Sequence, residues 1–285
     1  MKSVVVTGVS TGIGRGVVQF LIGNGIHVFG SVRKQTDADR LLLEFPNHFT
    51  PLLFDVTDQE SVRREAERVR VALAGQTLFG LVNNAGIAIP GPLCHQSLAD
   101  FRQHIDVNLV GAFVTSQAFV PHLGADKGLA GEPGRIVNIT SLGGKIGSPF
   151  LGGYCSAKHG LEGLSEVLRR ELMIYGIDVI IVGPGAVKTP IWQKAETADF
   201  SEASNGDYVL AMRKFSEFLK GASADGLSVE RVGEIVFNAL TVANPKVRYA
   251  LAPNLFFDWI VPRSLPRRVV DRFFARRLGL VRITR

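Results

Sequence analysis

The chain has 285 residues, a formal net charge of +6 and two cysteines, Cys94 and Cys155. Two cysteines exclude a disulfide framework, and we expect a reduced, cytoplasmic setting. No apolar run approaches the roughly 18 residues of a membrane span. The first strand pattern starts so close to Met1 that no signal peptide is expected. The histidines are scattered without ligand spacing, so no metal site is predicted.

The first element is a β-branched run, Lys2 to Val6, that leads directly into a glycine-rich turn. An amphipathic helix pattern from Ile13 to Ile22 follows, and Gly23-Asn24-Gly25 is typical of a helix end. Strand, turn and helix together present backbone N–H groups and a helix N-terminus to a pyrophosphate. Glycine clusters also occur in ordinary turns, but here the flanking strand and helix fit nucleotide binding. The cofactor contacts predicted in this turn are Gly8, Ser10, Thr11, Gly12, Ile13 and Gly14.

Strand patterns then alternate with helix patterns along the chain. The predicted strands are 3–7, 26–32, 50–55, 78–82, 134–140, 177–182 and 246–251. Strands separated by helices imply a parallel sheet that is covered on both faces. No linker, low-complexity tract or internal repeat divides the chain, so residues 1–285 are expected to form a single α/β domain.

A possible proton-transfer group lies in the middle of the chain. Tyr154 and Lys158 are four residues apart, and Ser141 lies thirteen positions before Tyr154. On a helix this spacing places phenol and ammonium on one face. A tyrosine titrates near pH 10, so its use near neutrality requires about 4 kcal/mol of preferential phenolate stabilisation. A fixed cation supplies such stabilisation and burial opposes it. Alternatively, the two residues merely share a helix face.

Four further motifs occur in order and at compatible spacing. They are Asn83-Asn84-Ala85-Gly86, Asp106-Val-Asn108, Asn138-Ile-Thr-Ser141 and Pro184-Gly185-Ala-Val187-Lys-Thr189. With the glycine turn and the Tyr–Lys pair, they make the first 190 residues or so resemble the short-chain dehydrogenase/reductase family, in its compact Tyr-x-x-x-Lys branch. The resemblance implies a doubly wound Rossmann-type fold with a seven-stranded parallel sheet. It also implies hydride transfer between a nicotinamide cofactor and a carbonyl or alcohol.

The resemblance assigns roles residue by residue. Tyr154 would give a proton to the carbonyl oxygen or take one from the alcohol, and Ser141 would hydrogen-bond that oxygen. Lys158 would lower the pKa of Tyr154 and hold the nicotinamide ribose, and Asn108 would anchor a water that connects Lys158 to solvent. The implied cofactor contacts beyond the glycine turn are Arg33, Lys34, Asp55, Val56, Asn83, Ala85, Gly86, Tyr154, Lys158, Pro184, Gly185, Val187 and Thr189.

Three residues near these sites have a second interpretation. Cys155 adjoins the tyrosine but is interpreted as a packing residue rather than a redox group. His159 is interpreted as a helix-surface residue rather than a second base. Asp55 matches the family's contact with the adenine ring, and the alternative is a cap for the helix expected near Ser61.

The end of the second strand bears on the choice of cofactor. An acidic side chain there would bind the adenosine ribose, whereas arginine would pair with a 2′-phosphate. This chain has Val32 followed by Arg33 and Lys34, so NADP(H) is favoured. The alternative is that both cations are solvated loop residues and that Asp37 or Asp39 binds the ribose, as NAD(H) would require.

Residues 190–226 match the region that forms the substrate lid in this family. Its aromatic side chains are Trp192, Phe200, Tyr208, Phe215 and Phe218, and Leu142, Phe150 and Leu151 lie near the catalytic residues in sequence. Such a lining suits a bulky lipophilic carbonyl or alcohol, although Phe215 and Phe218 at helical spacing also suit a core. The chain is also similar to the hydroxysteroid and retinol dehydrogenase members of the family.

The C-terminal extension, residues 255–285, carries the positive charge. From Arg263 to Arg285 there are eight arginines and one aspartate, a net +7, so the rest of the chain carries −1. Val269, Val270, Phe273, Phe274 and Leu278 recur at helical spacing between arginines. Such a basic amphipathic helix can lie on an anionic membrane surface. The alternative is that it closes the substrate pocket or packs against another subunit. No nucleic-acid-binding module accompanies the charge.

The family resemblance leaves two rival classes of function. A non-catalytic nucleotide sensor keeps the fold but usually loses the tyrosine or the lysine, and both are present here. Epimerases, dehydratases and enoyl reductases on related scaffolds tend to differ in glycine spacing or in the Tyr–Lys gap. Family members commonly assemble, so a homodimer or homotetramer is expected.

Overall fold

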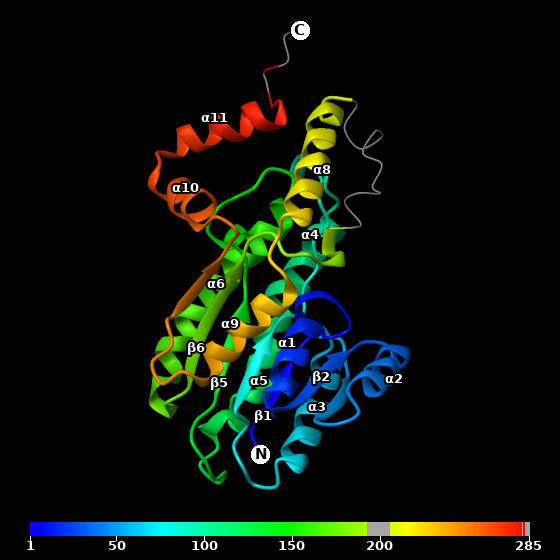
Figure 1. Ribbon diagram of the computed structural model, residues 1–285, viewed down its shortest axis with the longest axis vertical. Coiled ribbons are helices and arrows are strands. Elements are labelled where there is room, and N and C mark those ends of the chain that lie inside the picture. Colours follow the sequence, from blue (N-terminus) through cyan, green and yellow to red (C-terminus); the bar gives the residue numbers. More distant parts are fainter. Residues whose placement is uncertain (193–205, 281, 283–285) are drawn as a thin grey trace.

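A computed structural model describes residues 1–192, 206–280 and 282. Seven parallel strands form one sheet in the order β3-β2-β1-β4-β5-β6-β7 (Figure 1). The strands are β1 Ser3–Val6, β2 His27–Val32, β3 Phe49–Leu53, β4 Gly80–Asn83, β5 Arg135–Ile139, β6 Asp178–Pro184 and β7 Arg248–Leu251. Each lies within two residues of its predicted range, which confirms the doubly wound α/β fold.

Helices cover both faces of the sheet. They are α1 Gly12–Gly23, α2 Gln35–Glu44, α3 Gln59–Ala72, α4 Leu98–Ile105, α5 Gly111–Phe119, α6 Gly152–Glu171, α8 Val209–Ala224, α9 Val229–Thr241, α10 Val261–Ser264 and α11 Arg267–Leu278. One apolar core joins the sheet to α1, α2 and α9, and a second joins its other face to α3 and α5. Because both faces are covered, the central strands consist mainly of apolar residues, and these have almost no exposure.

The strand order reverses between β1 and β4, which are neighbours in the sheet but not in sequence. At such a switch point the connections leave in opposite directions, and a crevice opens beyond the carboxyl ends of the two strands. The glycine turn follows β1, and the segment Asn84 to Gly86 follows β4. The predicted cofactor residues therefore line one crevice.

The C-terminal extension forms a separate layer. A π-helical segment, Phe256–Ile260, leads into α10 and α11, and α11 packs against α8 (Figure 1). Leu278 of α11 is buried, and Arg277 stacks on Phe218 of α8 at 4.9 Å from the ring centre. The helix expected from the spacing of Val269 to Leu278 is therefore present. Among the described residues, none of the helices has the length and apolar character to cross a membrane.

Candidate active site

The glycine turn depends on glycine at three positions, for two separate reasons. Gly8 and Gly12 have φ values of +69° and +59°, a region that side chains disfavour. Gly14 is needed for packing, because a Cβ there would lie 2.3 Å from the carbonyl oxygen of Gly8. The same turn brings Gly12 against the side chain of Thr189, since a Cβ on Gly12 would lie 3.4 Å from it. The turn thus joins two predicted cofactor segments.

Helix α1 begins without the side-chain cap that α3, α4 and α9 have. Asp58, Ser97 and Ser228 cap α3, α4 and α9 through their side chains. Thr11 at the start of α1 makes no such hydrogen bond, and the first turn of α1 holds no acidic residue. The N–H groups of that turn and the positive end of the helix therefore suit an anionic group. A nucleotide pyrophosphate fits this cradle.

Four residues outside the predicted cofactor contacts hold the turn in place. The Thr7 hydroxyl accepts hydrogen bonds from the backbone N–H groups of Asn84 and Ala85, both at 2.9 Å. The Asn84 amide donates to the carbonyls of Thr7 and Gly8 at 2.9 and 3.1 Å. Ser31 accepts from the Gly8 N–H at 3.0 Å. Arg40 donates to the Ser10 carbonyl at 2.7 Å. These contacts link β1, β2 and β4 at the crevice.

Asn83 has a different role from the one expected. Its side-chain amide donates to Ser116 and Asn138 at 2.9 and 2.8 Å, and its oxygen accepts from Thr115 at 2.6 Å. The side chain therefore lies inside the protein, where it joins β4 to β5 and α5, so that only the main chain of Asn83 is left for the predicted cofactor contact. Successive residues of a strand face opposite sides of the sheet, which is why Asn84 instead meets the glycine turn.

The two residues after Asn84 behave as expected of a crevice wall. Ala85 lies against the glycine turn, since a Cβ on Gly8 would come within 2.9 Å of its Cα. Gly86 is exposed, and a Cβ on it would lie 3.0 Å from the Asn108 side-chain oxygen and 3.7 Å from Lys158 Nζ. Open backbone at Gly86 thus connects the cofactor crevice to the catalytic group.

The predicted adenosine contacts cluster at the ends of β2 and β3. Arg33 and Lys34 are exposed after β2, and Arg33 lies 3.7 Å from Asp55. Asp55 accepts hydrogen bonds from the N–H and hydroxyl of Thr57 and does not cap α3, which Asp58 does. The Val56 side chain is buried against Gly111, so only its main chain remains for a cofactor.

The catalytic residues meet at the end of β5. Ser141 follows β5, and its hydroxyl accepts a hydrogen bond from the Gly143 N–H at 3.0 Å. Tyr154 and Lys158 lie on one face of α6, with Lys158 Nζ 5.9 Å from the Tyr154 ring centre. Lys158 donates to the Ile139 carbonyl at 2.8 Å. The structure thus brings Ser141, Tyr154 and Lys158 together, as the sequence predicted.

Asn108 completes the group from the opposite side. It sits in a π-helical turn, Asp106–Val110, between α4 and α5, and its side chain is buried. Its oxygen accepts from the Ile87 N–H at 2.8 Å and its amide donates to the Ile87 carbonyl at 2.9 Å. A π-helical turn is rare and often marks a functional site. Asn108 therefore fixes the chain beyond Gly86 beside Lys158.

Burial dominates the ionisation of the catalytic pair. Burial raises the pKa of Tyr154 to about 12, although a hydrogen bond with the Ser141 side chain opposes the rise. Burial lowers the pKa of Lys158 to about 8, and the Glu162 carboxylate opposes that fall. The expected lowering of the Tyr154 pKa by Lys158 is therefore not seen. The sequence placed the two residues on one helix face but did not reveal that both are buried.

The segment Pro184 to Thr189 closes the site. Gly185 N–H donates to the Leu251 carbonyl at 2.7 Å, and Lys188 N–H donates to the Leu227 carbonyl at 3.0 Å. Val187 is buried in the core shared with α1 and α9. These contacts hold the segment between the glycine turn and Leu142. Gly185 lies close to Leu142, since a Cβ on Gly185 would be 3.1 Å from the Leu142 side chain.

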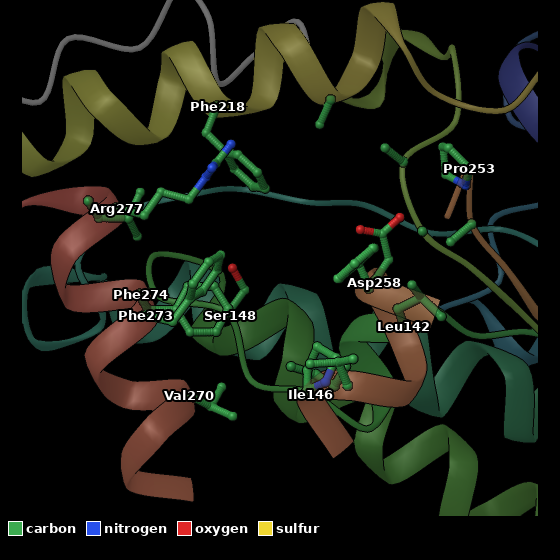
Figure 2. Close-up of a pocket in the computed structure, with 18 of the residues that line it drawn as sticks. Leu142, Ile146, Ser148, Phe218, Pro253, Asp258, Val270, Phe273, Phe274 and Arg277 are labelled. Carbon is green, nitrogen blue, oxygen red and sulfur yellow. The ribbon is translucent and has the colours of Figure 1, made fainter. Parts of the chain in front are cut away.

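A cavity of about 660 Å³ adjoins the catalytic group. Its inner wall includes Leu142, Ser148 and Gly185, and its other walls come from α8 and the C-terminal extension (Figure 2). Phe218 of α8 and Arg277 of α11 face each other at one end, and Asp258 points into the space near Leu142. Most of the remaining lining is apolar, with aromatic side chains from Phe215, Phe257, Phe273 and Phe274. The cavity has the size and lining of a small-molecule site.

The expected lid aromatic residues divide into two groups. Phe215 is buried in the apolar cluster around Tyr154 and also reaches the cavity, and Phe218 is partly buried at its edge. Tyr208 contacts Phe150 edge to face at 6.0 Å. Phe200 and the Trp192 side chain lie outside the described residues. Both interpretations of Phe215 and Phe218, core and ligand contact, therefore hold in part.

The two neighbours of the catalytic pair lie as interpreted. Cys155 is buried in the same apolar cluster, where burial raises the pKa of its thiol. His159 is exposed, and its Nδ1 bonds the Cys155 carbonyl at 2.8 Å. No three His, Cys, Asp or Glu side chains gather as a metal site in the part of the chain that the structure describes.

The comparisons with known proteins agree with this geometry. The family model for short chain dehydrogenases matches residues 2–199. An NADPH-dependent 3-dehydrocapnine reductase from Ornithobacterium rhinotracheale is 36% identical over 278 residues, 98% of each chain. Retinol dehydrogenase 5 from Mus musculus is 31% identical over 93% of this chain and 85% of the relative. The crystal structure of a short-chain dehydrogenase from Streptomyces avermitilis has a TM-score of 0.76 at 23% identity, with 95% of both chains covered.

Proposed function

Because the chain belongs to the short-chain dehydrogenase/reductase family and is therefore an oxidoreductase, we propose that it uses NADPH to reduce the carbonyl group of a lipophilic substrate. The observation that carries the proposal is the apolar cavity beside the predicted catalytic residues: Leu142, which follows Ser141, lines it, and its lining residue Phe215 packs in the same apolar cluster as Tyr154. A reductase needs both parts, a proton donor and a site that holds the carbonyl beside it.

NADPH is the proposed cofactor because of the charges beyond β2. Arg33 and Lys34 are exposed at the crevice, and guanidinium groups pair well with phosphate. The partner of Arg33, Asp55, is itself more than one-third exposed, so the pair is weak and a phosphate can compete for the arginine. A relative at 36% identity is named as NADPH-dependent. NAD(H) remains the alternative cofactor.

The protonation of Tyr154 favours reduction over oxidation. With a pKa of about 12, the Tyr154 hydroxyl keeps its proton at neutral pH. NADPH, when bound, supplies the hydride to the carbonyl carbon. The oxygen that then becomes negative is more basic than a phenolate and takes the proton from Tyr154 Oη. Ser141 holds the same oxygen by a hydrogen bond, and the Lys158 ammonium stabilises the phenolate that remains.

The cavity favours a bulky or long apolar substrate. Phe215, Phe218 and Phe274 line it together with aliphatic side chains from α10 and α11. Sugars would leave their hydroxyl groups without partners on such walls, which costs free energy. A steroid-, retinoid- or polyketide-like skeleton, or an alkyl chain, fits this lining. The retinol dehydrogenase relative is consistent with a lipophilic substrate.

Exposed apolar residues on the C-terminal extension support a peripheral membrane contact. The exposed fractions are 56% for Phe256, 65% for Phe257 and 59% for Phe273, and α11, which carries Phe273, also carries five arginines. Exposed aromatic side chains beside arginine are typical of surfaces that bind anionic lipid. We propose that the enzyme is cytoplasmic, touches a membrane through this face and forms a homodimer or homotetramer.

Vesicle sedimentation tests the membrane contact. Phosphatidylglycerol vesicles should retain the wild-type protein and release Phe256→Ser/Phe257→Ser. Leu43→Ser is the control, because Leu43 is 85% exposed on α2, away from the extension. Equal retention of all three proteins would contradict the contact. A change of solution mass in the double variant alone would instead assign the face to a subunit interface.

Steady-state kinetics test the reductase. The wild type should oxidise NADPH with long-chain ketones, steroids or retinaldehydes and prefer NADPH to NADH in kcat/KM. Arg33→Ser should reduce that preference by about tenfold, because one charged hydrogen bond to the phosphate is lost. Lys2→Ser is the control, a cation outside the crevice. A preference for NADH in the wild type would contradict the cofactor assignment.

A further inference from the structure

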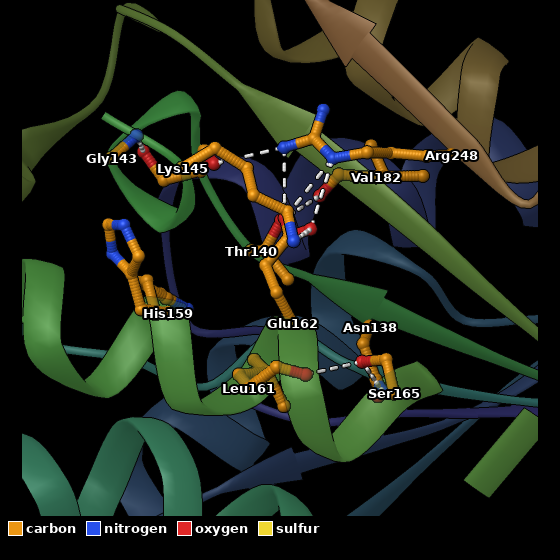
Figure 3. A network of polar contacts seen from close by, with 12 residues as sticks. Asn138, Thr140, Gly143, Lys145, His159, Leu161, Glu162, Ser165, Val182 and Arg248 are labelled. Atoms are coloured by element: carbon orange, nitrogen blue, oxygen red, sulfur yellow. Dashed lines mark hydrogen bonds and ion pairs between the residues drawn. The ribbon is translucent and has the colours of Figure 1, made fainter. Parts of the chain in front are cut away.

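A buried carboxylate lies one helical turn beyond Lys158 and has no role in the steps above. Glu162 is 1% exposed, although charged side chains are rarely buried without partners. Its oxygens accept hydrogen bonds from the Thr140 hydroxyl at 2.7 Å and from Arg248 at 2.9 to 3.2 Å (Figure 3). Lys145 Nζ lies 3.6 Å away. Glu162 is therefore the centre of a buried ionic network.

Arg248 connects this network to the C-terminal extension. It comes from β7, and its Nη2 donates both to Glu162 and to the Ser141 carbonyl, the latter at 3.3 Å. Its guanidinium stacks on Trp259 at 4.2 Å from the ring centre, and Arg263 stacks on the same ring at 4.4 Å. The arginine thus touches the catalytic loop and a wall of the extension at once.

Three consecutive residues at the end of β5 are each held by one member of the network. Lys158 binds the Ile139 carbonyl, Glu162 binds the Thr140 hydroxyl, and Arg248 binds the Ser141 carbonyl. Lys158 and Glu162 approach from α6 and Arg248 from β7, so the strand end is held from two sides. Few degrees of freedom remain for the Ser141 hydroxyl.

We propose that Glu162 and Arg248 are positioning residues that fix Ser141 and that they act on the charge of Lys158 in opposite directions, the carboxylate supporting it and the guanidinium weakening that support. The proposal rests on the proposed reductase function, in which Ser141 and Lys158 act on the substrate and cofactor. It adds two residues that neither touch the reacting atoms nor belong to the motifs in the sequence. Through Trp259, the same arginine ties the geometry of the catalytic loop to the extension that lines the cavity.

The charges around Lys158 determine whether each substitution raises or lowers the pKa of this lysine. Tyr154 and Glu162 face it from α6, with Arg248 and Lys145 behind the carboxylate, while Asn108 and the Ile139 carbonyl are neutral. Burial lowers the pKa of Lys158 to about 8, and Glu162 opposes the fall. Loss of the Glu162 charge leaves two cations and lowers the lysine pKa further. Loss of the Arg248 charge strengthens the carboxylate's effect and raises it.

The test is the pH dependence of two variants with opposite predictions. In Glu162→Gln, the pH above which NADPH affinity and kcat/KM decline should move down. In Arg248→Met it should move up. Both variants should lower kcat about 10- to 100-fold, because Ser141 is less well placed. Glu166→Gln is the control: it removes a carboxylate one turn further along α6, at an exposed site paired with Lys145 and Arg170. Its profile should match the wild type.

A third variant separates position from charge. Arg248→Lys keeps the charge but loses the forked contacts to Glu162 and Ser141. It should lower kcat without moving the pH profile. If a neutral variant does not fold, Arg248→Lys still tests whether Arg248 positions Ser141. Unchanged kcat in Arg248→Lys, or shifts of the same sign in the two neutral variants, would overturn the proposal. Absence of NADPH binding or turnover in the wild type would instead contradict the reductase function.

Discussion

The cofactor crevice and the substrate cavity are built in different ways. Around the glycine turn, backbone groups are held by hydrogen bonds with Thr7, Asn84 and Ser31, and a side chain at Gly8, Gly12 or Gly14 would be strained or would clash. The cavity between α8 and α11 is lined mainly by apolar side chains, several of them exposed at its mouth. The first region fixes positions through hydrogen bonds and close steric contacts, whereas the second selects by shape and apolar area. Under the proposed function, reaction type and substrate choice therefore depend on separate parts of the chain.

This contrast predicts that catalytic variants change kcat while cavity variants change KM. The largest effect is expected for Tyr154→Phe, which removes the proton donor and keeps the ring. Turnover should fall about 10²- to 10⁴-fold. NADPH affinity, measured by fluorescence titration, should stay near the wild-type value. Tyr175→Phe, on the segment after α6, should leave both quantities unchanged. Near-normal turnover in Tyr154→Phe would contradict the assigned role.

Gly14→Ala should disrupt the cofactor crevice and leave the substrate cavity unchanged. The new Cβ would lie 2.3 Å from the Gly8 carbonyl oxygen, so the turn must move. NADPH binding should weaken strongly, and the free energy of unfolding should fall by about 1–3 kcal/mol. Gly23→Ala on the same helix has open space around the new methyl group and should instead stabilise the protein by up to about 1 kcal/mol. Chemical denaturation and NADPH titration distinguish the two variants.

The pH dependence should be set by the catalytic group alone. Lys158 has a pKa of about 8 and is protonated below that pH. Its charge should be lost above pH 8. The value of kcat/KM for NADPH should therefore fall with rising pH, and the slope should approach about tenfold per pH unit. Tyr154, with a pKa of about 12, should not contribute below that range. Activity that increases steadily from pH 8 to pH 10 would show that neutral Lys158 is the active form and contradict this assignment.

Phe218→Ala should produce the smallest of these effects and confine it to the substrate. The ring lies at one end of the cavity, under Arg277. Its loss should raise KM for the longest ketone by about 10- to 100-fold, the equivalent of about 1.5–3 kcal/mol of burial. The kcat value and NADPH affinity should change little. Phe113→Ala, exposed on α5, provides the control. A lower kcat with unchanged KM would place Phe218 in the catalytic group instead.

The sequence predicted what depends on local spacing. The glycine turn, the i, i+4 pair of Tyr154 and Lys158 and the seven strands all follow from short motifs or periodic patterns. The cavity followed only in part: Leu142, Phe215 and the C-terminal helix with Phe274 were candidate wall residues, but their meeting could not be derived, because they come from segments far apart in the sequence. Chain patterns indicate that such residues are apolar but not what they meet.

The remaining differences between the sequence-based predictions and the structure have one physical cause, which is burial. The pKa of Tyr154 is raised because the ring packs among residues of α8 that lie far away in sequence. Asn83 turns inward because its partners, Ser116 and Asn138, come from other elements. Glu162 and Arg248 meet across 86 residues. A hint was present for Glu162, since a carboxylate one turn after Lys158 lies on the buried face of the same helix.

The most direct test of the whole account is the rate of NADPH oxidation with a series of methyl ketones of increasing chain length. The account predicts that kcat/KM rises by up to about fourfold per added methylene until the cavity is filled, since each contributes about 0.8 kcal/mol. It also predicts that the activity disappears in Tyr154→Phe. A kcat/KM that does not depend on chain length, or no NADPH-dependent reduction of any ketone, would contradict it.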